Sequence, residues 1–444
     1  MDKHVIPNSG NESGATGNTK QVEPKKVGTF ASLGINNFRF LLAGSIFSYA
    51  IQWIQQVVLN WLVYDITGSG TVLGSINLVS TLASLIMIPM AGLLIDRLNR
   101  RKLMLFNVVW LFTVTGLLGL ALVTGHNSII YLFIFAFLFS LVGTVDMTLR
   151  QVLVFDLVPR VLAPNAMALI QTGWSVMRVI GPSVGGLMIV WLGAGGSFLA
   201  QSGLYVLIAI MVLLIRFPPR VPESGTSSPV QNIRVGLQFI VENRQTLIFM
   251  LIGIVMPLLA IPIFVILPPI YAVKVFGDDT GRILGFLMAS VGVGGVLGGM
   301  VTASLRRMER WGLIQLASLL FLGGSLIAFA LSSSLVLAMV FMALSGFFEI
   351  IFLTTNQTMI QLSIPDRLRG RVTAVASLTW MLSPIGNMVA GAGADFVGPV
   401  NITVILASLT MVVTVIIYFI SPTIRNYRLT QSIAASTVNN ITTH

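Results

Sequence analysis

Apolar stretches and short polar connections alternate along most of this 444-residue chain. Each apolar stretch has about 20 residues or slightly more, the length that a helix needs to cross roughly 30 Å of hydrocarbon. None shows the alternating segments of about 10 residues that are typical of transmembrane barrels. The pattern predicts an all-α integral membrane protein with twelve transmembrane helices, at 39–64, 72–95, 103–124, 129–150, 165–192, 197–216, 246–273, 281–304, 312–331, 335–357, 371–394 and 400–421.

A longer polar connection, residues 217–245, divides the predicted helices into two groups of six. Its first half is rich in Pro, Ser and Gly, whereas its second half has the apolar spacing of a helix that lies on the membrane surface. We therefore expect an N-terminal six-helix bundle over 39–216 and a C-terminal six-helix bundle over 246–421. The polar segments 1–38 and 422–444 are predicted to be cytoplasmic tails, and the first is expected to be disordered.

The two halves also resemble each other in sequence. A constant offset of 206 residues relates Gly92 to Gly298, Arg100 to Arg306, Arg101 to Arg307, Gln151 to Gln357, Pro159 to Pro365, Trp174 to Trp380 and Gly185 to Gly391. Two parallel six-helix repeats, related by an axis along the membrane normal, are typical of a large class of transporters. The repeat therefore predicts a transporter built from two parallel six-helix repeats.

Composition and charge support a membrane location. The mean hydropathy is +0.91 and only 9% of the residues are charged, against about a quarter in soluble domains. Of the 26 lysines and arginines, Lys274 and Arg282 lie in a connection on one side, Arg178 lies within a span, and the other 23 lie on the opposite side. Positive residues mark the cytoplasmic side. The net charge of +11 is thus explained by orientation in the cell membrane rather than by nucleic-acid binding, with both termini in the cytoplasm.

Several kinds of chemistry are excluded from the predicted spans. The chain has no cysteine, and its three histidines, His4, His126 and His444, lie in tails or a connection, so no metal site built on histidine is expected within the membrane. No G-x-x-x-x-G-K-[S/T] loop is present, so ATP does not drive this chain. We expect no cofactor and no enzymatic activity, but a secondary transporter that uses an ion gradient. An intramembrane enzyme or a membrane receptor without transport is the alternative of another class.

The connection after the second span concentrates five charges in seven residues, within the stretch GLLIDRLNRRK, residues 92–102. It resembles the loop signature of the major facilitator superfamily between spans two and three, through Gly92, Asp96, Arg97, Arg100, Arg101 and Lys102. Asn99 stands where the family usually has Gly, and Asn tolerates the positive φ that a turn there requires.

Four further segments, residues 38–74, 145–169, 173–186 and 364–395, resemble the multidrug and siderophore exporters of this superfamily, such as the enterobactin exporter and macrolide efflux proteins. One of them carries the G-P-x-x-G-G motif that the family associates with export, Gly181, Pro182, Gly185 and Gly186; helix packing is the alternative role for its glycines. The resemblance implies a monomeric, proton-coupled exporter of small amphipathic compounds by alternating access. A nutrient or lysophospholipid transporter of the same fold is the alternative.

Four charged residues inside predicted spans are candidates for coupling: Asp146, Arg150, Arg178 and Glu349. Such residues cost about 2.5–3.5 kcal/mol each on insertion scales, so they usually face a cavity or a partner. Glu349 has no cation within a helical turn of its own span, and a carboxyl in low dielectric favours its neutral form. It is therefore the first candidate for the coupling proton. Asp146 is the second, although Arg150 or Arg178 is expected to hold it ionised; the resemblance favours coupling or gating roles for these two arginines.

Gln52, Gln56 and Asn60 are spaced by four in the first span, which places their amides on one helix face. They are candidates for lining a central cavity, and Asn77, Gln171, Trp174 and Trp380 are candidates for extending it. Interhelical hydrogen bonding is the alternative role for the amides. Aromatic walls with few charges suit an amphipathic or aromatic substrate.

The charged loop is also predicted to act as a latch. When the cytoplasmic side closes, Asp96 is expected to accept hydrogen bonds at the N-terminus of the eleventh span, near Gly370 and Arg371. Arg97 and Arg100 are expected to pair with Asp146 or Asp156. Because Thr302 and Ala303 replace the Asp-Arg pair in the second repeat, the latch is expected on one half only.

Overall fold

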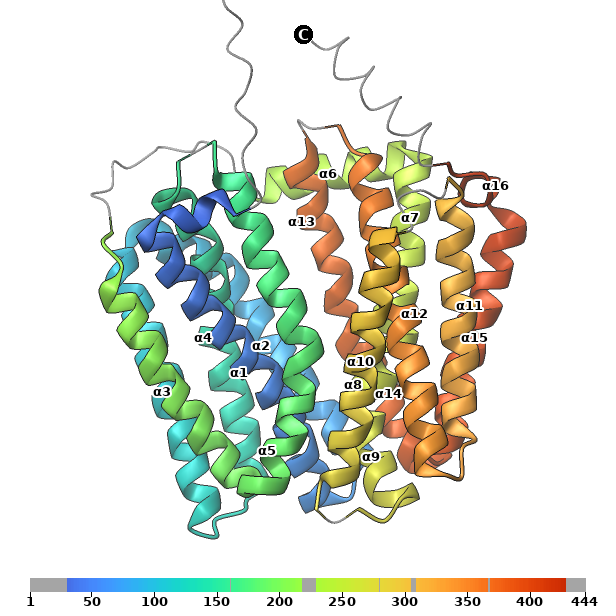
Figure 1. Ribbon diagram of the computed structural model, residues 1–444, viewed down its shortest axis with the longest axis horizontal. Helices are drawn as coiled ribbons and strands as arrows, with labels where there is room; N and C mark the ends of the chain where they lie inside the picture. Colours follow the sequence, from blue (N-terminus) through green and yellow to red (C-terminus); the bar gives the residue numbers. More distant parts are fainter. Residues whose placement is uncertain are drawn as a thin grey trace, which may run out of the picture.

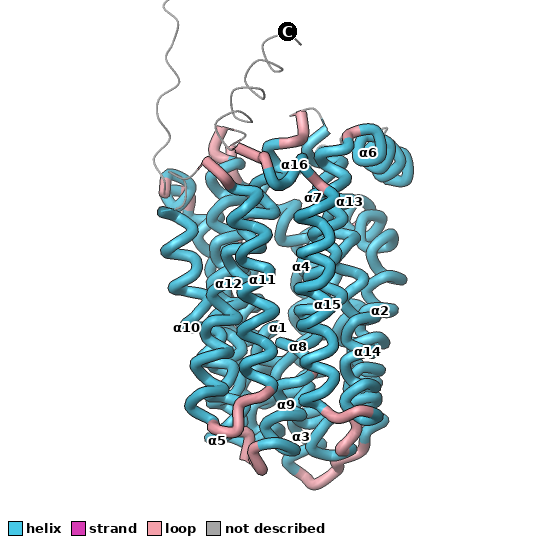
Figure 2. The backbone as a smooth tube through the Cα atoms, turned by 90° about the vertical axis from the view of Figure 1, so that its right-hand side faces the viewer, coloured by secondary structure: helices cyan, strands magenta, loops and turns pink. Residues whose placement is uncertain are grey.

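The computed structural model describes residues 30–159, 161–217, 229–278, 280–304, 309–365 and 368–428. Within these ranges the chain forms helices, turns and short connections, and no strand. Two bundles of long helices stand side by side (Figure 1). Their connections gather at the two ends of the bundles (Figure 2).

The first bundle consists of five long helical segments, preceded by a short 3-10 turn. These elements are η1 (Ala31–Gly34), α1 (Asn36–Thr67), α2 (Gly70–Arg97), α3 (Arg100–Val123), α4 (Ile129–Leu157) and α5 (Ala163–Leu214). Gly193 interrupts α5 with φ 66° and ψ 176°, a backbone conformation that is open essentially to glycine. The 52-residue α5 therefore comprises two spans, on either side of Gly193.

The second bundle is more irregular. Its elements are α7 (Arg244–Val255), η2 (Met256–Ala260), α8 (Ile261–Val265), α9 (Leu267–Ile270), η3 (Tyr271–Val275), α10 (Arg282–Ser304), α11 (Trp311–Ala330), α12 (Leu335–Leu362), α13 (Arg369–Thr379), η6 (Trp380–Leu382), α14 (Ser383–Phe396), α15 (Pro399–Ile420) and α16 (Pro422–Arg425). Segments α7 to η3 form one span that the prolines at 257, 262, 268 and 269 divide, because proline removes a helical hydrogen bond.

Ten helical segments of the described chain are long and apolar enough to cross a membrane. One of these ten segments is α5, which contains two spans and is therefore counted as two. The 32-residue α1 is not among the ten, because the amides in its middle lower its hydropathy, but it runs the length of the bundle beside α5 (Figure 1). The fold is therefore the predicted one: all-α, with twelve transmembrane helices in two six-helix bundles.

We call the end of the bundles that carries α6 (Pro229–Glu242) the linker end, and the opposite end, with the connections at 68–69, 124–128, 276–281, 331–334 and 397–398, the distal end. Helix α6 lies across the tops of the second-bundle helices (Figure 1). Gly236 and Ile240 are buried, while Leu237 and Val241 are 52% and 63% exposed. Helix α6 is therefore amphipathic, as the sequence predicts.

The predicted N-terminal tail extends too far into the chain. Residues 30–38 form η1 and the start of α1, and Ser32 is fully buried. Its hydroxyl donates to Asn165 Oδ1 at 2.7 Å, and its backbone N–H donates to the same oxygen at 3.1 Å. A polar sequence thus becomes ordered because α5 supplies its hydrogen-bond partner. The remainder of the predicted tail, residues 1–29, lies outside the described residues, as do residues 429–444.

The bundles meet along two helix pairs, α2 with α14 and α5 with α10. Glycines make both contacts close: a Cβ on Gly391 would lie 2.0 Å from the Gly70 carbonyl oxygen, and one on Gly186 would lie 2.2 Å from the Gly285 Cα. In span order these pairs are the second with the eleventh and the fifth with the eighth. Each is the counterpart of the other in the predicted repeat.

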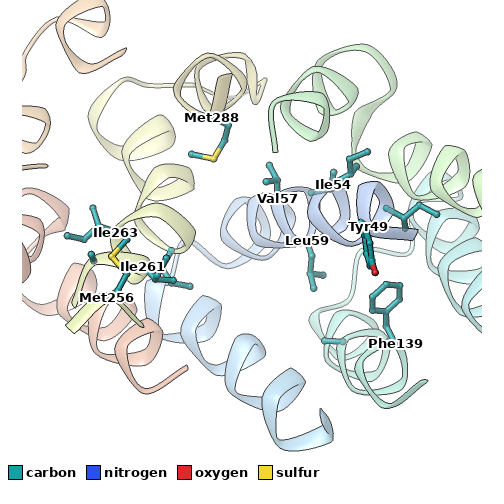
Figure 3. Packing of buried hydrophobic residues seen from close by; sticks show 14 of the residues in the cluster. Tyr49, Ile54, Val57, Leu59, Phe139, Met256, Ile261, Ile263 and Met288 are labelled. Carbon is teal, nitrogen blue, oxygen red and sulfur yellow. The ribbon is translucent and has the colours of Figure 1, made fainter. Parts of the chain in front are cut away.

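Inside each bundle the core is apolar. Figure 3 shows Ile54 and Val57 on one side of α1 and Leu59 on another, with Tyr49 over the ring of Phe139. The first two face α5, where a Cβ on Gly185 would lie 3.2 Å from the Ile54 carbonyl oxygen and 3.3 Å from the Val57 Cβ. Close packing of α1 on α5 fixes the rotation of α1, and this decides which of its polar residues reach the space between the bundles.

Candidate functional site

A cavity of about 240 Å³ lies between the two bundles. It is lined by Trp53, Gln56, Val57, Asn60, Arg178, Val179, Pro182, Ile261, Phe264, Val265, Pro269, Leu284, Met288, Val291, Gly292, Gly295, Glu349, Ile350, Trp380, Ser383 and Asn387. These residues come from α1 and α5 of the first bundle and from six elements of the second. We call this space the central cavity. Its walls are aromatic and aliphatic, with a small number of polar groups, as in sites for amphipathic ligands.

An ion pair crosses the central cavity from one bundle to the other. Arg178 of α5 donates from Nη2 to Oε1 of Glu349 on α12. The Arg178 side chain is 23% exposed and that of Glu349 is 6% exposed. Because both charges are largely removed from water, each depends on the other for compensation. The pair therefore ties the two bundles together near the middle of α12 and of the part of α5 that precedes Gly193.

This contact corrects one expectation and adds a partner that the sequence did not predict. Glu349 does have a cationic partner, supplied by another helix, and Arg178 pairs with Glu349 rather than with Asp146. The physical reason is the rotation of α5: glycines at 181 and 185 face α1, so that the next face of the helix, with Arg178, meets the central cavity. Spacing along one helix cannot reveal a partner from a helix 171 residues away.

Asp146 and Arg150 form a separate pair inside the first bundle. Arg150 Nε donates to Asp146 Oδ2 at 2.7 Å and Nη2 donates to Oδ1 at 3.2 Å. The Ser48 hydroxyl donates to Asp146 Oδ2 at 3.1 Å, and Arg150 is fully buried. A bidentate arginine–carboxylate pair is among the strongest hydrogen-bonded contacts in proteins. Neither residue lines the central cavity, so the pair belongs to the packing of α4 against α1.

The three amides of α1 do not share one cavity. Gln56 and Asn60 line the central cavity, whereas Gln52 lines a small cavity of about 20 Å³ beside Asp146 in the first bundle. At about 3.6 residues per turn, a spacing of four advances roughly 40° around the helix, so two such steps turn the face by roughly 80°. That rotation takes Gln52 off the surface that meets the second bundle.

The Asn60 side chain connects the two bundles by a hydrogen bond to the backbone of the second bundle. Its Nδ2 donates to the Val265 carbonyl oxygen at 3.0 Å. In a regular helix that carbonyl accepts from the residue four positions later, which here is Pro269 and has no N–H. Asn60 thus satisfies a carbonyl that a proline leaves without its helical partner. Asn77 donates to Asn60 Oδ1 at 3.2 Å, so both amides form the interhelical hydrogen bonds that were the alternative to a cavity role.

The predicted aromatic residues divide similarly. Trp380 lines the central cavity and is 44% exposed. Trp174 packs against Trp53, with ring centroids 5.4 Å apart, and against Tyr49 at 5.1 Å. Gln171 is exposed and does not line this cavity.

Among the lining residues that the sequence did not predict, Trp53 and Asn387 carry buried polar atoms without a partner. Asn387 is 4% exposed, and its Oδ1 has no hydrogen-bond partner among the described residues; the same holds for the Trp53 indole nitrogen. An amide within an apolar span was the available signal for Asn387, because buried polar groups are normally hydrogen-bonded. These two atoms can therefore offer an acceptor and a donor to a bound molecule.

The glycines of the fifth-span motif pack against neighbouring helices. A Cβ on Gly181 would lie 2.5 Å from the Trp53 Cβ, which shows how closely α5 approaches α1 there. Gly185 also meets α1, while Gly186 meets Gly285 of α10 in the other bundle. Pro182 lines the central cavity. The motif thus joins three helices of both bundles immediately beside Arg178.

The charged loop lies at the linker end. Asn99 has φ −66° and caps α3, accepting from the N–H groups of Arg101 and Lys102 at 3.0 and 3.2 Å. The expected positive φ is therefore wrong, because asparagine serves as an N-cap instead. Arg100 pairs with Asp156, and Asp96 and Arg97 are exposed.

The latch between Asp96 and the N-terminus of α13 stays a prediction, because the structure shows the bundles sealed at the other end. A Cβ added to Gly92 would have no heavy atom within 4 Å, so no other helix packs closely on α2 there. A Cβ added to Gly236 of α6 would lie 2.7 Å from the Arg371 carbonyl oxygen, so the start of α13 packs against α6. The repeat partners Arg306 and Arg307 lie outside the described residues.

Comparisons with known proteins agree with this architecture. The chain is 24% identical over 387 residues to the staphyloferrin A transporter of Staphylococcus aureus, covering 86% of this chain and 96% of that protein. It is 26% identical over 379 residues to the multidrug efflux pump Tap of Mycolicibacterium fortuitum, covering 83% and 91%.

Solved structures share the fold. A D-xylose–proton symporter superposes with a TM-score of 0.68 at 14% identity, covering 89% of this chain and 99% of that one. A bacterial homologue of the human lysosomal transporter Spinster gives 0.65 at 18% identity, covering 88% and 96%. Residues 27–440 match the family described as transmembrane secretion effector. The chain belongs to this family, within the major facilitator superfamily of membrane transporters.

Proposed function

We propose that this transporter is a proton-coupled exporter of small amphipathic compounds that works by alternating access as a monomer. The linker end faces the cytoplasm in this proposal, because nearly all lysines and arginines outside the spans lie on that side. Both termini are then cytoplasmic, and the central cavity is the substrate site. The relative named as a multidrug efflux pump supports export as the direction.

The Arg178–Glu349 pair is the observation that carries the coupling. It is an ion pair that lines the central cavity and connects the two bodies that must move relative to each other. A proton on Glu349 removes its charge and thereby the Coulomb attraction to Arg178. The contact between α5 and α12 then weakens at the point where substrate binds. Proton binding, substrate binding and bundle movement are thus linked through one pair of side chains.

The Asp146–Arg150 pair is the competing site. It is fixed within one bundle by two hydrogen bonds from Arg150 and one from Ser48. Protonating Asp146 would loosen α4 from α1 but would not alter a contact between the bundles. For this reason we assign the coupling proton to Glu349.

Transport by purified protein in liposomes tests the assignment, with ethidium as the probe. Glu349→Gln should reduce transport driven by a pH gradient at least tenfold while leaving downhill exchange at saturating ethidium intact, because the substituted residue carries no exchangeable proton. Asp146→Asn is the matched variant, since it also neutralises a buried carboxylate. Gradient-driven transport that survives in Glu349→Gln and disappears in Asp146→Asn would move the coupling site to Asp146.

Cells lacking the gene test the direction of transport. Export predicts a higher accumulation of ethidium than in wild-type cells. Unchanged ethidium together with slower uptake of a nutrient would favour the importer of the same fold.

A further inference from the structure

The charge inventory of the central cavity is short. Among the described residues that line it, Arg178 and Glu349 are the ionisable ones. The pair is neutral overall, and its more accessible member is the cation, at 23% exposure against 6% for the carboxylate. The remaining polar groups are the amides of Gln56, Asn60 and Asn387, the indole N–H groups of two tryptophans and the hydroxyl of Ser383. A molecule bound in the central cavity therefore contacts the neutral Arg178–Glu349 ion pair and, among the described lining residues, no other charged side chain.

Among the described residues of the helices packed against α12, no other ionisable side chain competes for Glu349 within the spans. The helices packed against α12 are α7, α10 and α11, and Arg178 reaches it from α5. Helix α7 carries Arg244 and α10 carries Arg282, each as its first residue, and α11 carries no ionisable residue. The first residue of α7 lies at the linker end and that of α10 at the distal end. The charge state of Glu349 is thus set by Arg178 and by the bound molecule.

Linkage between substrate and proton then depends on the sign of the substrate charge. A cation near the pair opposes the addition of a proton to Glu349, whereas an anion that docks on Arg178 draws the guanidinium away and favours the addition. By reciprocity, a proton on Glu349 weakens the binding of the cation and strengthens the binding of the anion. Export against an inward proton gradient requires that proton and substrate exclude each other.

We propose that the central cavity exports organic cations and neutral amphipathic molecules, and that Arg178 prevents organic anions from being exported by the proton gradient. This inference rests on the proposed function. With Glu349 ionised, the neutral pair leaves an apolar cavity that accepts such molecules. With Glu349 protonated, Arg178 is left as an uncompensated cation and repels a positive substrate. An anion, in contrast, binds together with the proton, so the gradient cannot drive it outward.

The other walls suit the same class of molecule. Trp53, Phe264 and Trp380 offer aromatic rings, and the faces of such rings attract organic cations. Asn387 Oδ1 is an acceptor without a partner among the described residues, and it suits an ammonium or hydroxyl donor. Cation recognition therefore does not require that the substrate displace Arg178 from Glu349.

Binding of two permanently charged probes to purified full-length protein tests the sign of the linkage. Ethidium is the cation and 1-anilinonaphthalene-8-sulfonate is the anion. Because the charge of each probe is permanent, a change in pH acts on the protein alone. Ethidium binding should weaken as the pH is lowered and should release protons into a weakly buffered solution. The anion should show the opposite pH dependence and take protons up.

Three variants locate the effect. Glu349→Gln should abolish proton exchange, lower ethidium affinity roughly tenfold and raise anion affinity by a similar factor, which is the effect of one unit charge about 10 Å away in an effective dielectric constant of about 20. The double variant Arg178→Gln/Glu349→Gln restores a neutral cavity and should recover ethidium affinity without proton exchange. Arg178→Lys keeps the charge and should keep the wild-type selectivity. Recovery in the double variant shows that the single variant is folded.

Ethidium binding that takes up protons, or anion binding that releases them, would overturn the inference. So would export of the anion driven by a pH gradient in liposomes. Failure of the proposed function looks different: ethidium flux would then ignore the pH gradient even though the two probes retain opposite proton exchange on binding.

Discussion

The two ends of the interface between the bundles are built differently. At the distal end, α2 and α14 are in backbone contact through Gly70 and Gly391. The carboxylate of Asp395 on α14 also caps α2: Oδ1 accepts from the Gly70 N–H at 2.8 Å, and Oδ2 accepts from the Thr71 N–H at 2.8 Å. At the linker end, Asp96 in the last turn of α2 is exposed, and Leu93 is 56% exposed.

This difference indicates how one helix serves two gates. The N-terminus of α2 has unpaired N–H groups and a partial positive charge, and Asp395 of the other bundle binds them. The predicted latch places Asp96, at the C-terminal end of the same helix, at the N-terminus of α13. If the predicted latch forms, each gate uses a carboxylate of one bundle and a helix N-terminus of the other. The distal gate is closed in this structure, and the linker-end gate is predicted to close in the opposite conformation.

The largest effect is expected from Gly391→Ala. The new methyl carbon would lie 2.0 Å from the Gly70 carbonyl oxygen, so α2 and α14 must separate at a cost of about 1–3 kcal/mol or more. Spin labels on cysteines introduced at Asn127 and Ser333, exposed positions in distal connections of the two bundles, should report a longer distance. Transport should fall at least tenfold, since roughly 1.4 kcal/mol corresponds to a factor of ten.

Gly324→Ala is the matched control, because no heavy atom lies within 4 Å of a Cβ at that position. The absence of cysteine from the natural chain means that the labels report only the chosen sites. A distal distance that stays the same in Gly391→Ala would show that the glycine contact does not hold the gate.

A smaller effect is expected from Asp395→Asn. The carboxylate also accepts from the hydroxyls of Ser69 at 2.8 Å and Thr71 at 2.7 Å, and the amide cannot replace all four acceptor contacts. Charge-assisted hydrogen bonds contribute about 1.5–3 kcal/mol, and exposure to solvent reduces that figure here. The same spin-label pair should show a larger fraction of molecules open at the distal end. A change confined to thermal stability, with the distance distribution intact, would count against a gating role.

The smallest effect in this conformation is expected from Asp96→Asn. Its latch acts in the opposite state, so the variant should shift the equilibrium toward the distal-closed state seen here, by about 0.3–1 kcal/mol for an exposed charge at a helix N-terminus. Combining it with Asp395→Asn should bring the distance distribution back toward that of the wild type. If Asp96→Asn leaves both accessibility at the linker end and transport unchanged, the latch does not exist.

The sequence by itself determined the number of spans, their grouping and the family. The length of each apolar stretch is fixed by the thickness of the bilayer, and the positions of Lys and Arg obey a rule that acts on each connection separately. The motif at residues 92–102 is likewise local, as is the N-cap at Asn99, although its role there was misjudged. Such features follow from neighbours in the chain, and they are preserved in the structure.

The tertiary structure decided which side chains meet. Glu349 seemed alone because its partner, Arg178, comes from the other bundle, and Gln52 seemed equivalent to Gln56 because periodicity alone does not fix the rotation of α1. Gly181 and Gly185 set that rotation through contacts with α1. Which side chains contact each other across helices depends on how the glycine-lined faces of those helices fit together. Because this fit involves two helices at once, the sequence of one helix cannot specify it.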